Sequence, residues 1–188
     1  KDFIMAVNWK KAEEYIKAGK GKIEKTKYAH NTWNDETHTG TSVIKEEVLV
    51  LDAMAMKDIC YLMPCPKSPH GCDVDPTGEY IVGSGKLAAL IPVFSFDKMI
   101  NAIGKKDYEG DYEGIPVLKY NSVLHGEVQK PGLGPLHTEF DGKGNAYTTF
   151  FVSSEVVKWD IKTLKVLDRV PTYYSVGHLC IPGGDSKK

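Results

Sequence analysis

Short apolar runs separated by turn residues dominate the chain after its first quarter. They are rich in β-branched and aromatic side chains and are bounded by Gly, Pro, Asp and Asn. This pattern is typical of β-strands that end in tight turns. It predicts strands at residues 48–51, 80–82, 90–96, 146–152, 155–159 and 165–170, and the opening run 2–7 has the same character.

The first third of the chain shows two other patterns. Residues 12–18 place Lys and Glu around Tyr15 and Ile16 and are followed by Gly19, which predicts a short helix. Residues 30–40 read HNTWNDETHTG, a polar stretch without periodicity. This stretch predicts an exposed loop, inserted between structured segments.

Two stretches of the chain can be laid over each other as an internal repeat. Each runs through a histidine, a strand, an Asp-x-x-Gly turn, an aromatic-bearing strand, a further strand and a turn that contains an aromatic residue and Asp. These features are His70, Asp75, Gly78 and Phe96-Asp97 in the first stretch, and His137, Asp141, Gly144 and Trp159-Asp160 in the second. His178 begins what is predicted to be a third unit, with residues 182–185 in the place of its turn.

A repeated four-stranded unit with Asp-Gly turns is typical of the blade of a β-propeller. A β-sandwich also has short strands at similar spacing and remains the alternative. The periodic histidine favours the propeller, because residues at matching positions of successive blades converge on one axis.

Three histidines at matching positions, His70, His137 and His178, are therefore candidate metal ligands. An all-histidine set without thiolate or carboxylate suits copper or zinc better than magnesium or calcium. Glu139 and Asp141 are candidates for orienting the ligand rings, with turn formation as their alternative role. The alternative for each histidine is an ordinary surface or core residue.

Composition excludes several classes of function. Lys and Arg number 24 against 25 Asp and Glu, so the net charge of -1 gives no field that attracts nucleic acid. The sequence has no apolar run of membrane-spanning length and no leader-like segment, although both ends look cut from a longer chain. Its four cysteines form no CxxC motif; we interpret them as isolated buried thiols, which do not fix the compartment.

Four motifs make the chain resemble part of the β-propeller domain of nitrous-oxide reductase. They are KSPHG at residues 67–71, GLGPLHTEFDG at 132–142, SEVVKW at 154–159 and YSVGHL at 174–179. The resemblance implies an all-β fold, with residues 1–188 forming about three to four blades of a seven-bladed propeller. It also implies a longer parent chain, whose C-terminal cupredoxin domain is absent here.

In that family, histidines from different blades hold a catalytic four-copper sulfide cluster. By similarity, His70, His137 and His178 are three of its ligands, and Lys158 corresponds to a lysine beside it. A calcium ion also belongs to the family, and Asp2 resembles one of its ligands. Ser68 stands where the family has an Asn ligand, which departs from that pattern.

The resemblance implies a periplasmic oxidoreductase, of the branch with general secretory leaders, that reduces nitrous oxide to dinitrogen and water in the last step of denitrification. Electrons would pass from a small donor, a c-type cytochrome or cupredoxin, through the binuclear copper centre of the cupredoxin domain in a homodimer. One alternative is a non-catalytic propeller that binds a protein partner. Another is a zinc hydrolase with three histidines and a water, for which the sequence offers no distinctive general base.

The chain by itself is predicted to be inactive, since it has only part of the ligand set, and to aggregate or stay partly unfolded. Propeller blades bury their faces only against their neighbours, so an incomplete set leaves strands uncovered. Size-exclusion chromatography and thermal unfolding of the isolated chain measure this. A monodisperse monomer that melts cooperatively would count against the propeller assignment.

Overall fold

The computed structural model describes residues 2–34, 36–37 and 39–184, which divide into two compact units. The first unit holds the described parts of residues 1–6, 61–112 and 116–188. The second holds the described parts of residues 7–60 and 113–115. The repeat histidines all belong to the first unit. Whether residues 1–188 are one part of a larger propeller domain stays a prediction.

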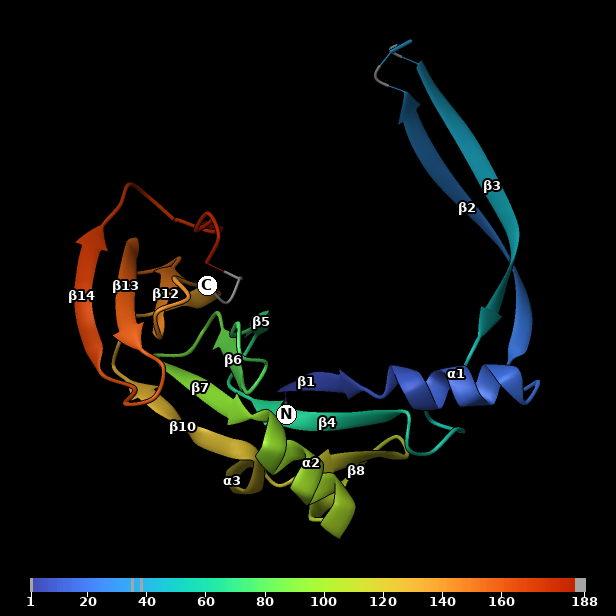
Figure 1. Ribbon diagram of the computed structural model, residues 1–188, viewed down its shortest axis with the longest axis horizontal. Coiled ribbons are helices and arrows are strands. Elements are labelled where there is room, and N and C mark those ends of the chain that lie inside the picture. The colour runs from blue at the N-terminus through green and yellow to red at the C-terminus, as the bar shows by residue number, and fades with distance from the viewer. Residues whose placement is uncertain (1, 35, 38, 185–188) are drawn as a thin grey trace. The chain divides into compact units, whose positions relative to one another are not determined.

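The second unit consists of helix α1 (Trp9–Lys17) and a long hairpin of strands β2 (Lys22–Asn34) and β3 (Thr39–Val50), drawn in blue in Figure 1. The predicted helix is confirmed but begins earlier, because the Asn8 side chain caps it by accepting from the Lys11 N–H at 3.1 Å. None of the helices in the described residues is long and apolar enough to cross a membrane.

The polar stretch 30–40 is not the loop that its composition predicts. Its residues 30–34 end β2, and its last two residues begin β3, with His30 paired to Val43 and Asn34 to Thr39. Asp35 and His38 lie outside the described residues. Backbone pairing across a hairpin does not need apolar side chains, so a polar sequence forms strands here.

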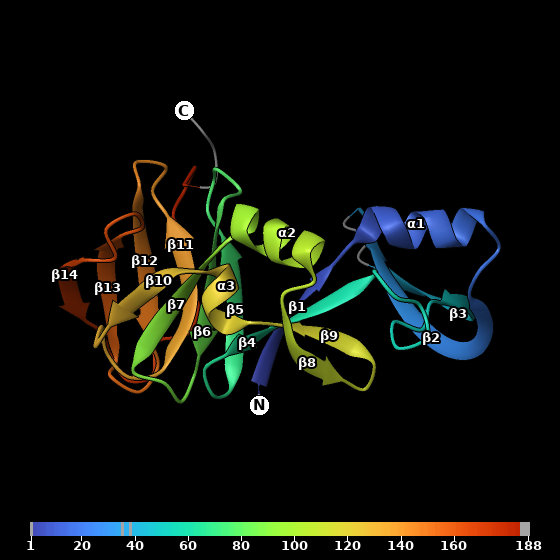
Figure 2. The same ribbon diagram turned by 90° about the horizontal axis from the view of Figure 1, so that it is seen from below.

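The first unit contains three four-stranded sheets (Figures 1 and 2). The first sheet has the order β1-β4-β9-β8, the second β10-β7-β6-β5 and the third β11-β12-β13-β14. The strands of the first sheet are β1 (Asp2–Val7), β4 (Cys60–Cys65), β8 (Tyr108–Tyr112) and β9 (Ile115–Leu118). The other strands are β5 (Pro69–Val74), β6 (Tyr80–Gly85), β7 (Leu90–Ser95), β10 (Leu124–Gln129), β11 (Pro135–Phe140), β12 (Asn145–Phe150), β13 (Glu155–Asp160) and β14 (Val166–Pro171).

The second and third sheets have the blade topology that the repeat predicts. In the third, four consecutive strands pair as an antiparallel meander. In the second, three consecutive strands do so, and β10 adds to β7 after an insertion. The all-β prediction is thus confirmed, although the described residues contain no strand after β14, where His178 was predicted to begin a third unit. Residues 182–184 do form a turn, and Asp185 lies outside the described residues.

The insertion between β7 and β10 begins with a helix that the sequence pattern missed. Residues Phe96–Lys105 form α2, whereas Phe96-Asp97 was predicted to be a turn. The Ser95 hydroxyl caps the helix by accepting from the Lys98 N–H at 3.1 Å, and Asp97 lies in its first turn. A short helix, α3 (Tyr120–Val123), precedes β10.

Both Asp-x-x-Gly turns and the Trp159-Asp160 turn are confirmed. Asp75 accepts from the backbone N–H of Thr77 at 3.2 Å and of Tyr80 at 2.9 Å. Asp141 accepts likewise from Lys143 at 2.8 Å and Asn145 at 3.2 Å. Asp160 accepts from the backbone N–H groups of residues 162 and 163. Carboxylates of this kind replace missing backbone partners and fix each turn locally.

The second sheet is buried on both faces. On one face, Val82, Ile91 and Val93 pack against the third sheet, whose Phe150 and Trp159 are fully buried. On the other face, Ile81 and Phe94 pack against α2 and the first sheet, in a cluster that also contains Ile4, Tyr61, Met63, Met99, Ala102, Leu118 and Val123. The three sheets therefore stack in succession, as neighbouring blades do.

Strands β5 and β11 come so close that position 71, on β5, has no room for a side chain. A Cβ atom added to Gly71 would overlap the backbone carbonyl of Leu136. Only glycine leaves room for this approach. Gly71 follows His70 directly, and Leu136 precedes His137, so the contact brings the two histidines together.

The substitution Gly71→Ala is expected to destabilise the contact between β5 and β11. Overpacking of this kind costs about 1–3 kcal/mol, which raises the rate of limited proteolysis roughly tenfold when opening governs cleavage. The matched control is Gly104→Ala in α2, where an added Cβ meets no atom within 4 Å. Equal cleavage rates in the two variants would show that β5 and β11 do not approach as described.

Candidate functional site

The three repeat histidines lie together. The ring centroids of His70 and His137 are 5.0 Å apart, and those of His137 and His178 are 4.4 Å apart. The third separation, between His70 and His178, is 6.4 Å. We call these three residues the histidine cluster. His70 and His178 are exposed, and the side chain of His137 is 25% exposed, so a bound group would reach all three from solvent.

Matching bulges present the first two histidines. The pairing of β5 with β6 shifts between Pro69 and Cys72, so His70 and Gly71 fall in the irregularity. The pairing of β11 with β12 shifts between Pro135 and Thr138, which places His137 in an equivalent position. Bulges redirect side chains and are common next to functional sites. The shared bulge explains why both rings leave the sheets toward the same place.

His178 reaches the cluster from the segment after β14. Its neighbour Gly177 accepts a hydrogen bond at its carbonyl from the Thr149 hydroxyl of β12. Further along, a Cβ atom at Gly184 would overlap the Phe140 carbonyl of β11. Two contacts with the third sheet therefore hold this segment beside His137.

The rings of the histidine cluster are not arranged around a single point. The rings of His137 and His178 are stacked at 27°, whereas those of His70 and His137 meet edge to face at 85°. Stacked rings do not aim their nitrogens at a common point. Indeed, within residues 2–34, 36–37 and 39–184 no three His, Cys, Asp or Glu residues are arranged to hold a single metal ion.

A carboxylate that the sequence did not nominate lies beside the cluster. Asp73 Oδ1 is 3.6 Å from His137 Nδ1, and Asp73 Oδ2 accepts from the Thr138 N–H at 2.8 Å. Asp141, which was nominated, is occupied by its own turn, where it also accepts from Tyr147. Glu139 faces Tyr147 across the pairing of β11 and β12, and its orienting role stays a prediction.

The surroundings of His70 favour a neutral ring. Partial desolvation, then the nearby His137, Lys86 and His178, lower the pKa of His70 from its ordinary 6.5, and Asp73 opposes them. A neutral imidazole is the form that binds a metal ion.

Lys158 lies on the third sheet, two strands away from β11. It pairs with Tyr147, which pairs with Glu139, and cross-strand partners share a face of the sheet. Lys158 therefore shares a sheet face with Glu139, which follows His137 by two residues, whereas His137 itself lies in the bulge. Its Nζ lies 5.5 Å from the centroid of the Tyr147 ring. The side chain is half-buried.

Asp2 is the first residue of β1 and contacts the loop that precedes His70. Its Oδ2 accepts from the Ser68 N–H at 2.6 Å, so the two positions that the resemblance connects with calcium are in contact. Ser68 has a left-handed backbone with φ of 61°. A calcium role for Asp2 stays a prediction.

The cysteines differ from the interpretation as isolated buried thiols. Cys60 is buried and Cys65 half-buried, but Cys72 and Cys180 are exposed. Burial, and to a smaller extent the neighbouring Cys72, raise the pKa of the Cys65 thiol to about 12. Cys65 and Cys72 are therefore neighbours, because short spacing along the chain does not show which thiols the strands bring together.

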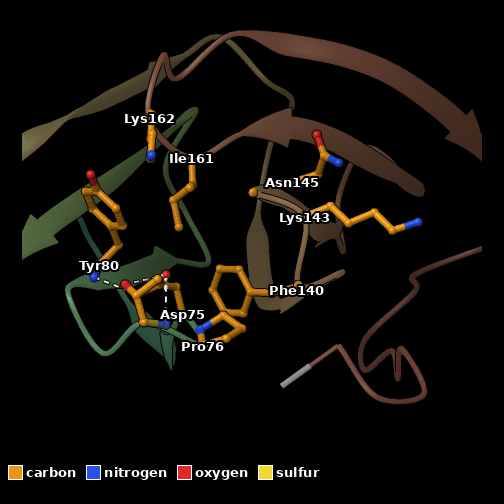
Figure 3. Close-up of a pocket in the computed structure, with 11 residues that line it drawn as sticks. Asp75, Pro76, Tyr80, Phe140, Lys143, Asn145, Ile161 and Lys162 are labelled. Atoms are coloured by element: carbon orange, nitrogen blue, oxygen red, sulfur yellow. Dashed lines mark hydrogen bonds between the residues drawn. The ribbon is translucent and has the colours of Figure 1, made fainter. Parts of the chain in front are cut away.

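A pocket of ≈ 250 Å³ opens elsewhere, between the Asp-x-x-Gly turns of the second and third sheets (Figure 3). Pro76, Phe140 and Ile161 form its apolar wall. Its carboxylate, Asp75, is occupied by the hydrogen bonds of its turn, drawn as dashed lines in Figure 3. The pocket is separate from the histidine cluster and suggests no ligand.

The amino-acid sequence is similar to those of several nitrous-oxide reductases. The nitrous-oxide reductase of Stutzerimonas stutzeri is 35% identical over 127 residues, which is 62% of this chain and 18% of that protein. Those of Ralstonia nicotianae and Pseudomonas fluorescens are 37% and 39% identical over 61% and 53% of this chain, and over 18% and 14% of theirs. The chain is related to the nitrous-oxide reductases. It spans less than a fifth of the length of these curated relatives.

Family models and solved structures add little to this relationship. No protein-family model matches the chain. Among solved structures, hydrazine synthase of Kuenenia stuttgartiensis superimposes with a TM-score of 0.42 at 11% identity, over 60% of this chain and 26% of that one. Apo AztD of Citrobacter koseri does so with a TM-score of 0.43 at 12% identity, over 72% of this chain and 32% of that one. Neither likeness is close enough to support an argument.

We expect His70 to titrate below 6.5, and Lys86→Gln to raise its pKa, since Lys86 disfavours a second positive charge nearby. The pH dependence of hydrogen–deuterium exchange at the ring carbon, followed by mass spectrometry, reports each histidine separately. The control, Lys67→Gln, removes the same charge from an exposed position of the same loop. If Lys86→Gln leaves the pKa of His70 unchanged or lowers it, the arrangement of the cluster is wrong.

Proposed function

We propose that this chain is part of a copper oxidoreductase that reduces nitrous oxide to dinitrogen and water, the last step of denitrification. The observation that supports it is the convergence of His70, His137 and His178 from three segments, with centroid separations of 4.4 to 6.4 Å. The similarity to nitrous-oxide reductases supports a related role independently.

In this proposal the three imidazoles are ligands of a four-copper sulfide cluster, whose other ligands come from segments outside this chain. The cluster supplies electrons and several metal contacts for a weakly binding substrate. The protein contributes nitrogen donors that are fixed before the metal arrives. Rigid bulges on packed sheets perform this task better than a mobile loop would.

We assign to Lys158 an electrostatic role beside the substrate. Its ammonium group would stabilise negative charge that develops on the substrate oxygen, and would donate a proton toward water formation. The position of Lys158 on the same sheet face as Glu139, two residues after His137, supports this role. The long side chain has to turn from the Tyr147 ring toward the histidine cluster.

The remaining assignments follow from the resemblance alone. They place the enzyme in the periplasm as a homodimer, with a cupredoxin domain that holds a binuclear copper centre. A c-type cytochrome or a small cupredoxin would donate the electrons. Asp2 would contribute to a calcium site, and its contact with Ser68 at 2.6 Å supports a structural connection to the His70 loop.

The two alternatives make different demands on the cluster. A zinc hydrolase needs three nitrogens aimed at one ion, which the stacked rings of His137 and His178 disfavour. A propeller that only binds a protein partner needs no metal at all. Copper binding that depends on the histidines therefore separates the proposal from the second alternative.

We expect His70→Ala, His137→Ala and His178→Ala each to lower the copper affinity of the native protein by on the order of tenfold or more, because each removes a donor. Copper per protein after dialysis against a graded chelator measures this. The control is His125→Ala, since His125 lies away from the cluster, against the Tyr80 ring at 4.8 Å and the Lys162 carbonyl at 3.2 Å. Unchanged copper in all three cluster variants, or equal loss in the control, would favour the protein-binding alternative.

A further inference from the structure

Asp73 connects the two strands that carry His70 and His137. It lies on β5, three residues after His70, and both of its oxygens reach β11. Oδ2 accepts from the Thr138 N–H at 2.8 Å, and Oδ1 lies 3.6 Å from His137 Nδ1. The carboxylate is therefore held by one residue of β11 and faces the ring of the residue before it.

The attachment of Asp73 is rigid, because Thr138 is anchored in the core. Thr138 is 2% exposed, and its hydroxyl lies 2.7 Å from the hydroxyl of Thr148. The Thr148 hydroxyl in turn accepts from the indole N–H of Trp159 at 2.9 Å, and Trp159 is fully buried. A continuous series of hydrogen bonds thus joins the packed core to the carboxylate beside His137.

Asp73 also acts on the second histidine. Its negative charge favours the protonated form of His70 and so opposes the lowering of the His70 pKa by burial, His137, Lys86 and His178. Gly71 lies between the two residues, and a Cβ atom there would come within 2.9 Å of Asp73 Oδ2. The same glycine that lets β5 approach β11 therefore also leaves room for the carboxylate.

We propose that Asp73 is the positioning residue of the histidine cluster, holding the His137 ring with its Nδ1–H toward the carboxylate and its Nε2 free to bind metal. This inference rests on the proposed copper role of His137. Carboxylates that hold the second nitrogen of a ligand imidazole fix its tautomer and its orientation, and their loss typically weakens metal binding 10–100-fold. No direct contact between Asp73 and the metal is required.

The competing account is that Asp73 only ties β5 to β11 through Thr138. The substitution Asp73→Asn distinguishes this account from the positioning role, because the asparagine carbonyl oxygen can still accept from the Thr138 N–H. The charge that favours Nδ1–H on His137 is lost. The control is Asp168→Asn, since Asp168 is exposed on β14 and its carboxylate accepts from the backbone N–H of Arg169 at 2.8 Å.

The first measurement is the tautomer of His137 in copper-free protein. Solid-state ¹⁵N NMR of histidine-labelled protein suits this chain in any state of association, and the sequence has only six histidines. At a pH where the ring is neutral, the wild-type protein is expected to have the Nδ1–H tautomer of His137. A wild-type His137 in the Nε2–H tautomer would overturn the proposal without any variant.

The second measurement compares the variants. Asp73→Asn is expected to give a mixture of tautomers at His137 and about tenfold or greater weakening of copper binding, whereas Asp168→Asn changes neither. Slow exchange of the Thr138 amide confirms that the variant keeps the structural hydrogen bond. A protected Thr138 amide with an unchanged tautomer and unchanged copper affinity would overturn the proposal in favour of the structural account.

The result also distinguishes this inference from the proposed function. If the tautomer responds to Asp73→Asn but copper binding does not depend on the histidines, the positioning role stands and the copper role fails. If copper binding depends on the histidines but neither readout responds to Asp73→Asn, the copper role stands and the positioning role fails.

Discussion

The close approach of β5 to β11 is the constraint on which the candidate site depends. Gly71 permits it by having no side chain where the Leu136 carbonyl lies. Because a bulge interrupts the pairing of each strand at the same relative place, His70 and His137 leave their strands together. Separating these two strands would divide the histidine cluster even if every residue of the cluster were retained.

Packing on both sides of the second sheet keeps this approach in place. Its residues alternate between two buried clusters, one shared with the third sheet and one with α2 and the first sheet. Cores of this kind are close-packed and resist small displacements, so strand edges at their margin are held in position. The hydrogen bonds from Trp159 to Asp73 carry this rigidity to the histidine cluster.

The sequence predicted most of what depends on short-range patterns. Strands β5, β6 and β7, the strands of the third sheet and the turns at Asp75 and Asp141 were predicted, because apolar runs and turn carboxylates act locally. Strand β10 was not predicted. Helix α2 was missed because Phe96-Asp97 was interpreted as a turn by analogy with the second repeat, although Ser95 is a standard helix cap. Most of the β2–β3 hairpin was missed because residues 30–40 were interpreted as a loop from their polar composition, which does not report backbone pairing.

The candidate site was predictable only in part, for a similar reason. The repeat placed the three histidines in register, and their proximity followed from the blade geometry. Asp73 was not nominated, because it contacts His137 and Thr138 from another sheet. The nominated carboxylates, Glu139 and Asp141, follow His137 closely along the chain. The sequence does show a carboxylate three residues after His70. Its relation to the histidine cluster became apparent only with the bulge in β5.

Together, these features bring three imidazole rings to one place, and the proposed function assigns these rings to a copper cluster. The most direct test is a crystal structure of the copper-loaded native protein with an anomalous difference map at the copper edge. Copper peaks are expected at bonding distance from a ring nitrogen of His70, of His137 and of His178, and the three rings are expected to bind more than one copper ion in total. Copper bound elsewhere, or a single ion that ignores one of the three rings, would contradict this expectation.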